Sequence, residues 1–267
     1  MTLVSTDWVE KNINNIKIID CSWHMPNMNR DGYKEYLEAH IQNAVFFDLD
    51  KNSDQMTDLP HMLTTSSDWE KIVSKMGISK DDEIVVYDNS DVLSSCRCWY
   101  NFIYFGHNDK LIHVLNGGLK KWKSENKPTT SIITKINPTK YTSSERKNLV
   151  KNKSEINENI NSEKFKVIDA RSKERFEGKV PDPRKNVRSG SIPNSVCLPF
   201  SQVIDEDFCF KSSEHLEKIF DKTLKNHENF PVFSCGSGVT ACVLALAYSL
   251  VKANYLPVIY DGSWAEY

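Results

Sequence analysis

The sequence predicts an α/β protein built from two similar halves, each with a mainly parallel sheet flanked by helices on both faces. Short apolar runs alternate with helical patterns along the chain, which is typical of β-α-β units. The second half also repeats the first: KVIDARS at 166–172 resembles KIIDCSW at 17–23, and FPVFSCGSGV at 230–239 resembles EIVVYDNSDV at 83–92. An internal repeat of this length indicates that one fold is present twice.

The order of patterns supports this organisation. The first half reads as a helix at 3–15 opened by Ser5 or Thr6, a strand at 17–20, a helix, turn and short strand at 36–50, a helix at 67–76, a strand at 83–87, a helix at 94–105, a strand at 111–115 and a helix through Trp122. The segment that follows is polar and rich in turn-forming residues. We therefore expect domains at 1–124 and 151–267, joined by a linker at 125–150.

Composition excludes several functional classes. The chain has 267 residues, 39% hydrophobic and 26% charged, with a net charge of −2, so we expect neither nucleic acid nor a membrane surface as a partner. We see no apolar run approaching the ~18 residues of a membrane span and no signal-peptide pattern. Seven scattered cysteines, without C-x-x-C spacing, indicate reduced thiols, a cytoplasmic location, and no metal or cofactor.

The stretch 231–252 carries the predicted chemistry. A buried strand at 231–234 leads into Cys235 and a glycine turn, and an apolar helix follows at 240–252. Gly236 and Gly238 would let backbone N–H groups converge on the sulfur, and the helix N-terminus, capped by Thr240, would further favour a thiolate. Cys235 is therefore the candidate nucleophile, and a buried structural cysteine is the alternative.

The motif CGSGVTA at 235–241 resembles the active-site loop of the 3-mercaptopyruvate sulfurtransferases, a branch of the tandem-domain rhodanese family. The resemblance covers nearly the whole chain and implies two rhodanese-like domains, with Gly236, Gly238, Val239 and Thr240 in the donor-binding loop. It also implies an enzyme that moves sulfur from 3-mercaptopyruvate through a Cys235 persulfide to a thiol, thioredoxin or cyanide, and releases pyruvate.

Related enzymes that use other donors differ at specific positions. Thiosulfate sulfurtransferases usually have two cationic residues after the cysteine, where this chain has Gly236 and Ser237. Cysteine-dependent phosphatases have arginine at the position of Ala241. The phosphatase reading fails on that residue. Thiosulfate:cyanide transfer stays as the alternative enzyme, and a non-catalytic sulfur carrier or scaffold is the alternative of another class.

The resemblance implies further site residues. Arg175 and Arg184 match the arginines that bind the donor carboxylate, whereas ordinary solvated charges or interdomain salt bridges are the alternative for both. Ser237, His61 and Asp50 would form a relay in which His61 polarises Ser237 and Asp50 fixes the His61 tautomer. Since Asp50 and His61 belong to the first half, we expect the active site to be built across both domains.

Several other residues have weaker assignments. Arg171 and Arg188 are alternative arginines, and Arg171 is expected to brace the fold. His40 and Asp48 are weaker candidates, and His40 is expected to hold a turn. In the second half Ser191 stands where the family usually has histidine.

The internal repeat also predicts whether the first domain is active, and the other cysteines are assigned separately. Asp88 falls opposite Cys235, so the first domain should be catalytically silent. Among the other cysteines, we expect Cys96, Cys98 and Cys209 to be partly exposed.

Overall fold

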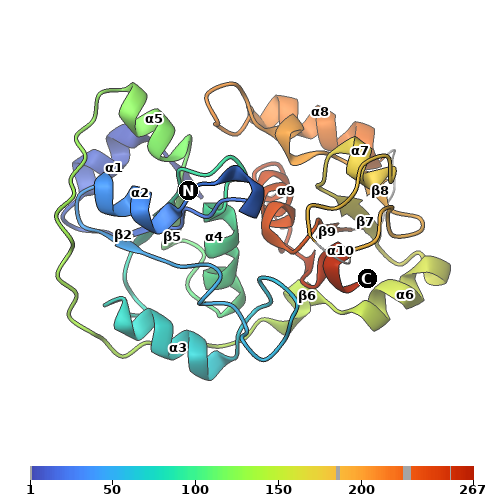
Figure 1. Cartoon of the computed structure of the whole chain (residues 1–267), viewed down its shortest axis with the longest axis horizontal. Helices are drawn as coiled ribbons and strands as arrows, with labels where there is room; N and C mark the ends of the chain where they lie inside the picture. Colours follow the sequence, from blue (N-terminus) through green and yellow to red (C-terminus); the bar gives the residue numbers. More distant parts are fainter. Residues whose placement is uncertain (1, 185–186, 225–229, 253) are drawn as a thin grey trace. The chain divides into compact units, whose positions relative to one another are not determined.

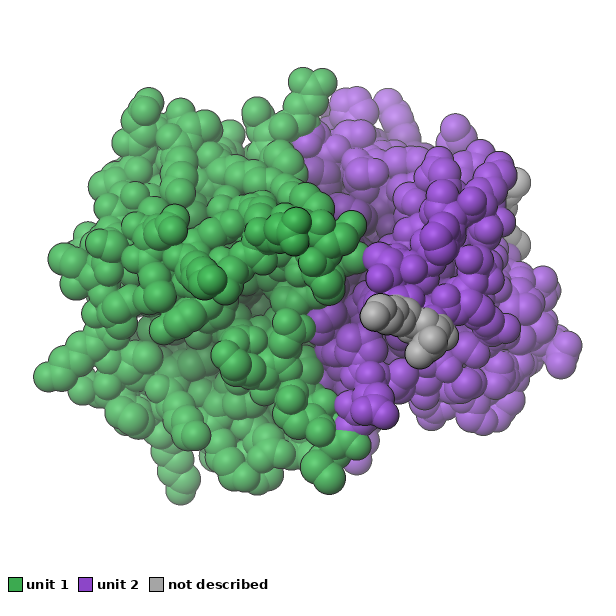
Figure 2. Space-filling view, viewed as in Figure 1, with its two compact units in different colours: residues 1–56, 63–146, 206–209 green, residues 57–62, 147–205, 210–267 purple. Residues whose placement is uncertain are grey.

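The computed structural model describes residues 2–184, 187–224, 230–252 and 254–267 (Figure 1). They form two compact units, coloured separately in Figure 2. Unit 1 comprises Met1–Met56, Leu63–Arg146 and Glu206–Cys209, and unit 2 comprises Thr57–Met62, Lys147–Asp205 and Phe210–Tyr267.

Unit 1 contains a parallel sheet with helices around it. Its described elements are β1 (Leu3–Val4), α1 (Thr6–Asn12), β2 (Lys17–Asp20), a 3₁₀ turn (Pro26–Met28), α2 (Gly32–Glu38), β3 (Ala44–Phe46), α3 (Ser66–Lys75), β4 (Ile84–Tyr87), α4 (Ser95–Tyr104), β5 (Ile112–Leu115) and α5 (Gly118–Ser124). The strand order is β1-β5-β4-β2-β3, and each neighbouring pair is parallel. Ile18 of β2 pairs with Val85 of β4 and with Ala44 of β3.

Unit 2 has the same architecture. Its described elements are a 3₁₀ turn (Lys147–Leu149), β6 (Val150–Lys151), α6 (Lys153–Ser162), β7 (Lys166–Asp169), α7 (Lys173–Phe176), β8 (Val196–Cys197), a 3₁₀ turn (Phe200–Val203), α8 (Ser213–Leu224), β9 (Pro231–Ser234), α9 (Val239–Ser249), β10 (Ile259–Tyr260) and α10 (Ser263–Glu266). The order β6-β10-β9-β7-β8 is again parallel throughout. It matches unit 1 strand for strand, so the predicted repeat and fold class are confirmed.

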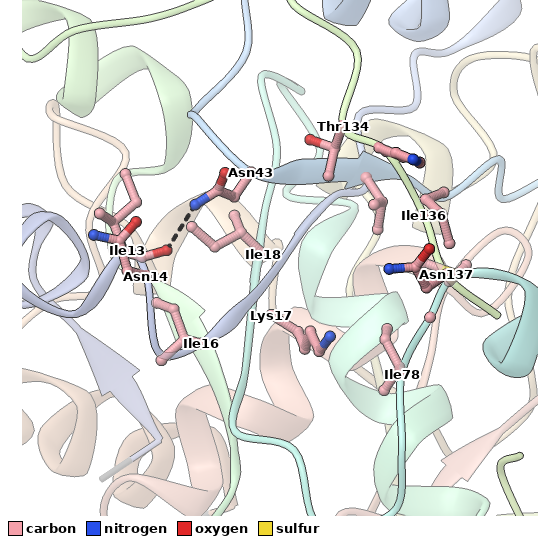
Figure 3. Close-up of a pocket in the computed structure, with 14 residues that line it drawn as sticks. Ile13, Asn14, Ile16, Lys17, Ile18, Asn43, Ile78, Thr134, Ile136 and Asn137 are labelled. Carbon is pink, nitrogen blue, oxygen red and sulfur yellow. Dashed lines mark hydrogen bonds between the residues drawn. The ribbon is translucent and has the colours of Figure 1, made fainter. Parts of the chain in front are cut away.

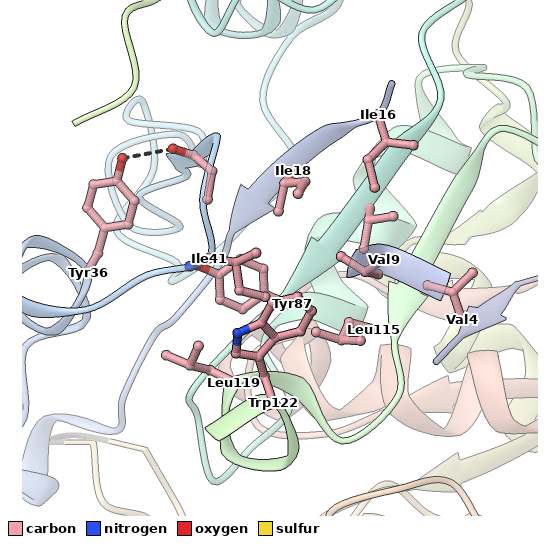
Figure 4. Close-up of a cluster of buried hydrophobic side chains, with 12 residues drawn as sticks. Val4, Val9, Ile16, Ile18, Tyr36, Ile41, Tyr87, Leu115, Leu119 and Trp122 are labelled. Carbon is pink, nitrogen blue, oxygen red and sulfur yellow. Dashed lines mark hydrogen bonds between the residues drawn. The ribbon is translucent and has the colours of Figure 1, made fainter. Parts of the chain in front are cut away.

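The strands of unit 1 are covered on both faces, so their sequences are nearly continuous apolar runs. These side chains form the core of the unit. Ile18, Tyr87, Leu115 and Trp122 belong to one buried cluster (Figure 4). Each such side chain contributes about 1.5–3 kcal/mol by leaving water. At the edge of the cluster the Tyr36 hydroxyl donates to the Ala44 carbonyl oxygen at 3.0 Å, which satisfies its polar end.

The N-terminus differs from the prediction. Leu3 and Val4 form a strand that pairs with β5, and the helix begins only at Thr6, where the Ser5 side chain accepts from the Trp8 N–H. The pairing partner is more than a hundred residues away in sequence, so local periodicity could not reveal it.

The boundaries of the two units also differ from the predicted ranges. Unit 1 extends to Arg146, and the short segment Thr57–Met62 within its range belongs to unit 2. The backbone of Thr130 exchanges hydrogen bonds with His40, and the Thr139 N–H donates to the Ser74 carbonyl oxygen at 3.0 Å. Tyr141 is buried. Most of the expected linker therefore packs on unit 1 because its backbone groups and this aromatic ring find partners there.

Unit 1 also has a pocket of about 250 Å³ (Figure 3). Its lining includes Ile16, Lys17 and Ile78, and the Asn43 side chain donates to the Ile13 carbonyl oxygen at its edge. Among the described lining residues there are none of the predicted site residues. In the described part of the chain, none of the helices is both long and apolar enough to span a membrane.

Candidate active site

The predicted nucleophile lies at the end of a central strand. Cys235 directly follows β9, whose residues are all buried, and is itself 2% exposed. α9 begins at Val239, with Gly238 at its N-cap in the left-handed conformation (φ 79°), which glycine adopts without strain. Thr240 therefore lies inside the first turn and does not cap the helix as predicted, because the helix starts one residue earlier than its apolar pattern indicated.

The C-terminal helix α10 holds the nucleophile loop. The Cys235 N–H donates to the Ser263 hydroxyl oxygen at 3.2 Å, and the Cys235 carbonyl oxygen accepts from the Trp264 N–H at 3.0 Å. The described residues donate no hydrogen bond to the Cys235 sulfur, so the predicted ring of N–H groups is not seen. Sequence reasoning missed the role of Ser263, although IYDGSWAEY at 259–267 resembles VLNGGLKKW at 114–122 and so marks a turn that both halves share.

Two arginines lie over the glycine that follows the nucleophile. Arg175 is on α7, whose first turn is capped by Ser172, and Arg184 is in the loop beyond it. A Cβ atom at Gly236 would meet Arg184 Nη1 at 2.7 Å and Arg175 Nη2 at 3.1 Å. Gly236 is thus required for the close approach of two guanidinium groups rather than for an unusual backbone angle.

A carboxylate that sequence reasoning missed joins these arginines. Asp182 accepts from Arg175 Nη2 at 2.5 Å and from Arg184 Nη1 at 3.2 Å, and its side chain is only 1% exposed. Burial by itself would raise the pKa of Asp182, but the Arg184 backbone N–H and the two guanidinium charges bring that pKa below its ordinary value. The PDPR sequence around it was the available signal.

His61 and Ser237 are in direct contact. His61 Nδ1 lies 2.9 Å from Ser237 Oγ, and Arg184 Nη2 donates to the same oxygen at 2.7 Å. Arginine can only donate, so in the neutral tautomer whose Nδ1 carries no proton the Ser237 hydroxyl donates to His61 Nδ1. His61 is buried and has a positive φ of 61°, and the segment 57–62 that carries it belongs to unit 2.

Asp50, the third predicted member of the relay, belongs to unit 1. Both its carboxylate oxygens accept from the Trp23 indole N–H at 3.0 Å. Its contact with His61, and with it the idea of a site built across two domains, stays a prediction.

The weaker candidates Arg171, Arg188 and His40 all contact backbone carbonyl oxygens of the fold. Arg171 is buried, pairs with Asp169 at 2.7 Å and donates to the Gly190 carbonyl oxygen, as expected for a residue that braces the fold. Arg188 donates to the Tyr267 carbonyl oxygen at the C-terminus. The His40 ring lies between backbone carbonyl oxygens of Tyr36 and Ile132, so it holds its turn as expected.

Asp48 and Ser191 are more exposed than Arg171 and His40. Asp48 accepts from the Lys51 N–H and pairs with the Lys51 ammonium at 2.8 Å, on the surface of unit 1. Ser191, which replaces the usual histidine, is half-buried.

Unit 1 has a carboxylate where unit 2 has the thiol. Asp88 follows β4 as Cys235 follows β9, and its oxygens accept from the N–H groups of Ser90 and Ser95 at 2.8 Å. Burial raises the pKa of Asp88. This side chain therefore satisfies the loop and helix N–H groups from within, at the position equivalent to the nucleophile.

Three of the remaining cysteines are less accessible than predicted. Cys96, Cys98 and Cys209 are buried, at 0%, 1% and 8% exposure, because α4 and the 206–209 segment pack into unit 1. Cys197 is half-buried, and burial raises its pKa to about 12, which keeps it a neutral thiol. Within the described residues, no group of three or more His, Cys, Asp or Glu side chains is arranged to hold a metal ion.

Comparison with known proteins identifies the fold and the chemistry. The family model described as "Rhodanese-like domain" matches residues 5–125 and 152–267. The chain belongs to the rhodanese family. Each matched region contains four of the five strands of one parallel sheet, because β1 and β6 lie just before it.

The relatives of this rhodanese carry sulfurtransferase names. It is 38% identical to the Arabidopsis thaliana mitochondrial thiosulfate/3-mercaptopyruvate sulfurtransferase 1 over 99% of this chain and 75% of the relative. It is 34% identical to the Rattus norvegicus 3-mercaptopyruvate sulfurtransferase, over 99% of this chain and 91% of the relative. The crystal structure of SseA from Escherichia coli, a 3-mercaptopyruvate sulfurtransferase, superposes with a TM-score of 0.89 at 28% identity, with 99% of each chain covered. This rhodanese is therefore a sulfur-transferring enzyme.

Proposed function

We propose that the protein transfers sulfur from 3-mercaptopyruvate to a thiol acceptor through a persulfide on Cys235, with pyruvate as the second product. The observation that carries this proposal is the pair of guanidinium groups, Arg175 and Arg184, over the Gly236 backbone beside the nucleophile. A planar guanidinium suits a carboxylate. 3-Mercaptopyruvate has a carboxylate at one end of a three-carbon chain and its sulfur at the other.

The transfer has two steps with balanced atoms and charges. The Cys235 thiolate attacks the donor sulfur, so that an S–S bond forms while the C–S bond breaks and its electron pair stays on carbon as the pyruvate enolate. One proton then converts the enolate to pyruvate. In the second step an acceptor thiolate attacks the outer sulfur of the persulfide and releases the Cys235 thiolate.

The Ser237 hydroxyl is the proposed source of the proton. Arg184 and His61 hold its oxygen at 2.7 and 2.9 Å. When the imidazole is protonated both its ring nitrogens are donors, so the Ser237 O–H is free to turn toward the enolate and His61 resupplies its proton. Asp50 keeps its proposed role of orienting His61.

Thiosulfate is the competing donor, because the name of the Arabidopsis relative includes it. It carries two negative charges, whereas the residues after the nucleophile are the neutral Gly236 and Ser237. This difference in charge favours 3-mercaptopyruvate. For the acceptor we propose a small thiol, thioredoxin or cyanide, and for the location the cytoplasm, which cell fractionation tests.

The test compares kcat/KM for both donors with one acceptor. 3-Mercaptopyruvate should be clearly preferred, and after donor without acceptor the intact mass should rise by about 32 Da, the mass of one sulfur in a covalent intermediate. Cys235→Ser should lose both the mass shift and turnover, whereas the matched control Cys197→Ser should keep them. Equal use of the two donors, or full activity in Cys235→Ser, would contradict the proposal.

A further inference from the structure

The carboxylate of Asp182 occupies the inner side of the arginine pair. It accepts from Arg175 Nη2 at 2.5 Å, from Arg184 Nη1 at 3.2 Å and from the Arg184 backbone N–H at 3.0 Å. Its side chain is 1% exposed, whereas those of the two arginines are 21% and 20% exposed. One internal carboxylate therefore pairs with both guanidinium groups, while about a fifth of each arginine side chain stays accessible.

This arrangement sets the charge that a donor encounters. Asp182 has a pKa below its ordinary value and is ionised at neutral pH. Its single negative charge offsets one of the two guanidinium charges. One net positive charge is left for a bound anion, which matches the single carboxylate of 3-mercaptopyruvate.

The N–H groups of the two arginines are only partly used by Asp182 and Ser237. Arg184 already uses Nη1 for Asp182 and Nη2 for Ser237. Arg175 Nε is buried and has no hydrogen-bond partner among the described residues. Each Nη atom carries two N–H groups, so the bonds to Asp182 and Ser237 leave further N–H groups on both arginines that a bound carboxylate can accept from.

We propose that Asp182 is a specificity-determining residue, which makes the site select a monoanionic sulfur donor over a dianionic one. This inference rests on the proposed function, because it explains how the site separates 3-mercaptopyruvate from thiosulfate. Asp182 acts through the arginines and by charge repulsion of the second negative charge.

The test is the ratio of kcat/KM for thiosulfate to kcat/KM for 3-mercaptopyruvate. Asp182→Asn keeps the size of the side chain and an oxygen that can accept from the Arg184 N–H, but removes the charge. The ratio should rise about tenfold, because a nearby unit charge in partly buried surroundings changes an anion's affinity by that order. Poorer positioning of the arginines would slow both donors equally and leave the ratio unchanged.

Two further variants separate charge from structure. Asp182→Glu retains the charge, so its rates should fall for both donors while the ratio stays near that of the wild type. Glu177→Gln removes a nearby carboxylate that pairs with Lys179, and it should change neither rates nor ratio. An unchanged ratio in Asp182→Asn, or an equal rise in Asp182→Glu, would overturn the inference.

The two hypotheses fail in different ways. If the wild type prefers thiosulfate, the proposed donor is wrong, but the change in ratio between wild type and Asp182→Asn still measures the effect of the Asp182 charge. If the wild type prefers 3-mercaptopyruvate and the ratio does not respond to Asp182→Asn, only the inference fails. Protection of Cys235 from alkylation by sulfate, compared with formate, gives a readout without turnover. Sulfate should protect Asp182→Asn better than the wild type.

Discussion

Replacing Gly236 with alanine is the sharpest test of the arginine pair. The new Cβ atom would lie 2.7 Å from Arg184 Nη1, and ordinary contact begins at 3.4 Å, so this guanidinium has to retreat by about 0.7 Å. Arg175 Nη2, at 3.1 Å, has to give by less. The residues that move are the ends of long side chains, so the protein should still fold.

Gly236→Ala should impair the use of the sulfur donor. A charge-assisted hydrogen bond is worth about 1.5–3 kcal/mol, so its loss should lower kcat/KM for 3-mercaptopyruvate about ten- to hundredfold. The free energy of unfolding should change by less than about 1 kcal/mol, because the backbone at Gly236 is not left-handed.

The assay combines steady-state kinetics with urea unfolding. Gly238→Ala is the comparison variant, since its φ of 79° should make the substitution cost about 1–2 kcal/mol of stability. If Gly236→Ala has the kcat/KM of the wild type, the donor carboxylate does not depend on where these guanidinium groups lie, and the reasoning fails.

Two more predictions concern a proton and a buried charge. His61→Asn removes the imidazole but retains a residue that tolerates the positive φ. The kcat should therefore fall about 10²- to 10⁴-fold, with little change in thermal stability. An unchanged kcat in steady-state assays would exclude the relay. In unit 1, burial raises the pKa of Asp20 from 3.8 to about 6, so the folded state binds this proton more tightly than the unfolded state. Relative to Asp20→Asn, the wild type should therefore lose up to about 3 kcal/mol of unfolding free energy as the pH rises from about 4 to 6. Urea titration measures this loss. If the difference in unfolding free energy between the two proteins stays constant with pH, the raised pKa of Asp20 is contradicted.

The fold was largely predictable because its signals are local or repeated. Continuous apolar runs marked β2, β4 and β9, since strands covered on both faces have no polar alternation. The internal repeat placed Asp88 opposite Cys235, and the strand orders confirm that equivalence. The strand Leu3–Val4 and the packing of residues 125–146 on unit 1 were not predictable, because both depend on partners distant in sequence.

The candidate site divides in the same way. The motif around Cys235 and the arginine-rich loop pointed to Arg175 and Arg184, because each lies in a recognisable stretch of sequence. The role of Asp182 was missed, since the PDPR sequence places Asp182 close to Arg184 but does not reveal the ion pair with Arg175. Ser263 was missed for a similar reason, because its hydroxyl accepts from an N–H that lies 28 residues earlier.

The sequence by itself determined the α/β class, the duplication, the candidate nucleophile and the family. These follow from apolar periodicity, from a repeat and from a short motif, all of which are properties of neighbouring residues. Only the tertiary structure decided that Asp182 joins two arginines over Gly236 and that the Ser263 hydroxyl accepts from the Cys235 N–H. The physical reason is that charge balance and hydrogen bonding at a site depend on distances of a few ångströms between loops, and these distances are set by the packing of the whole unit.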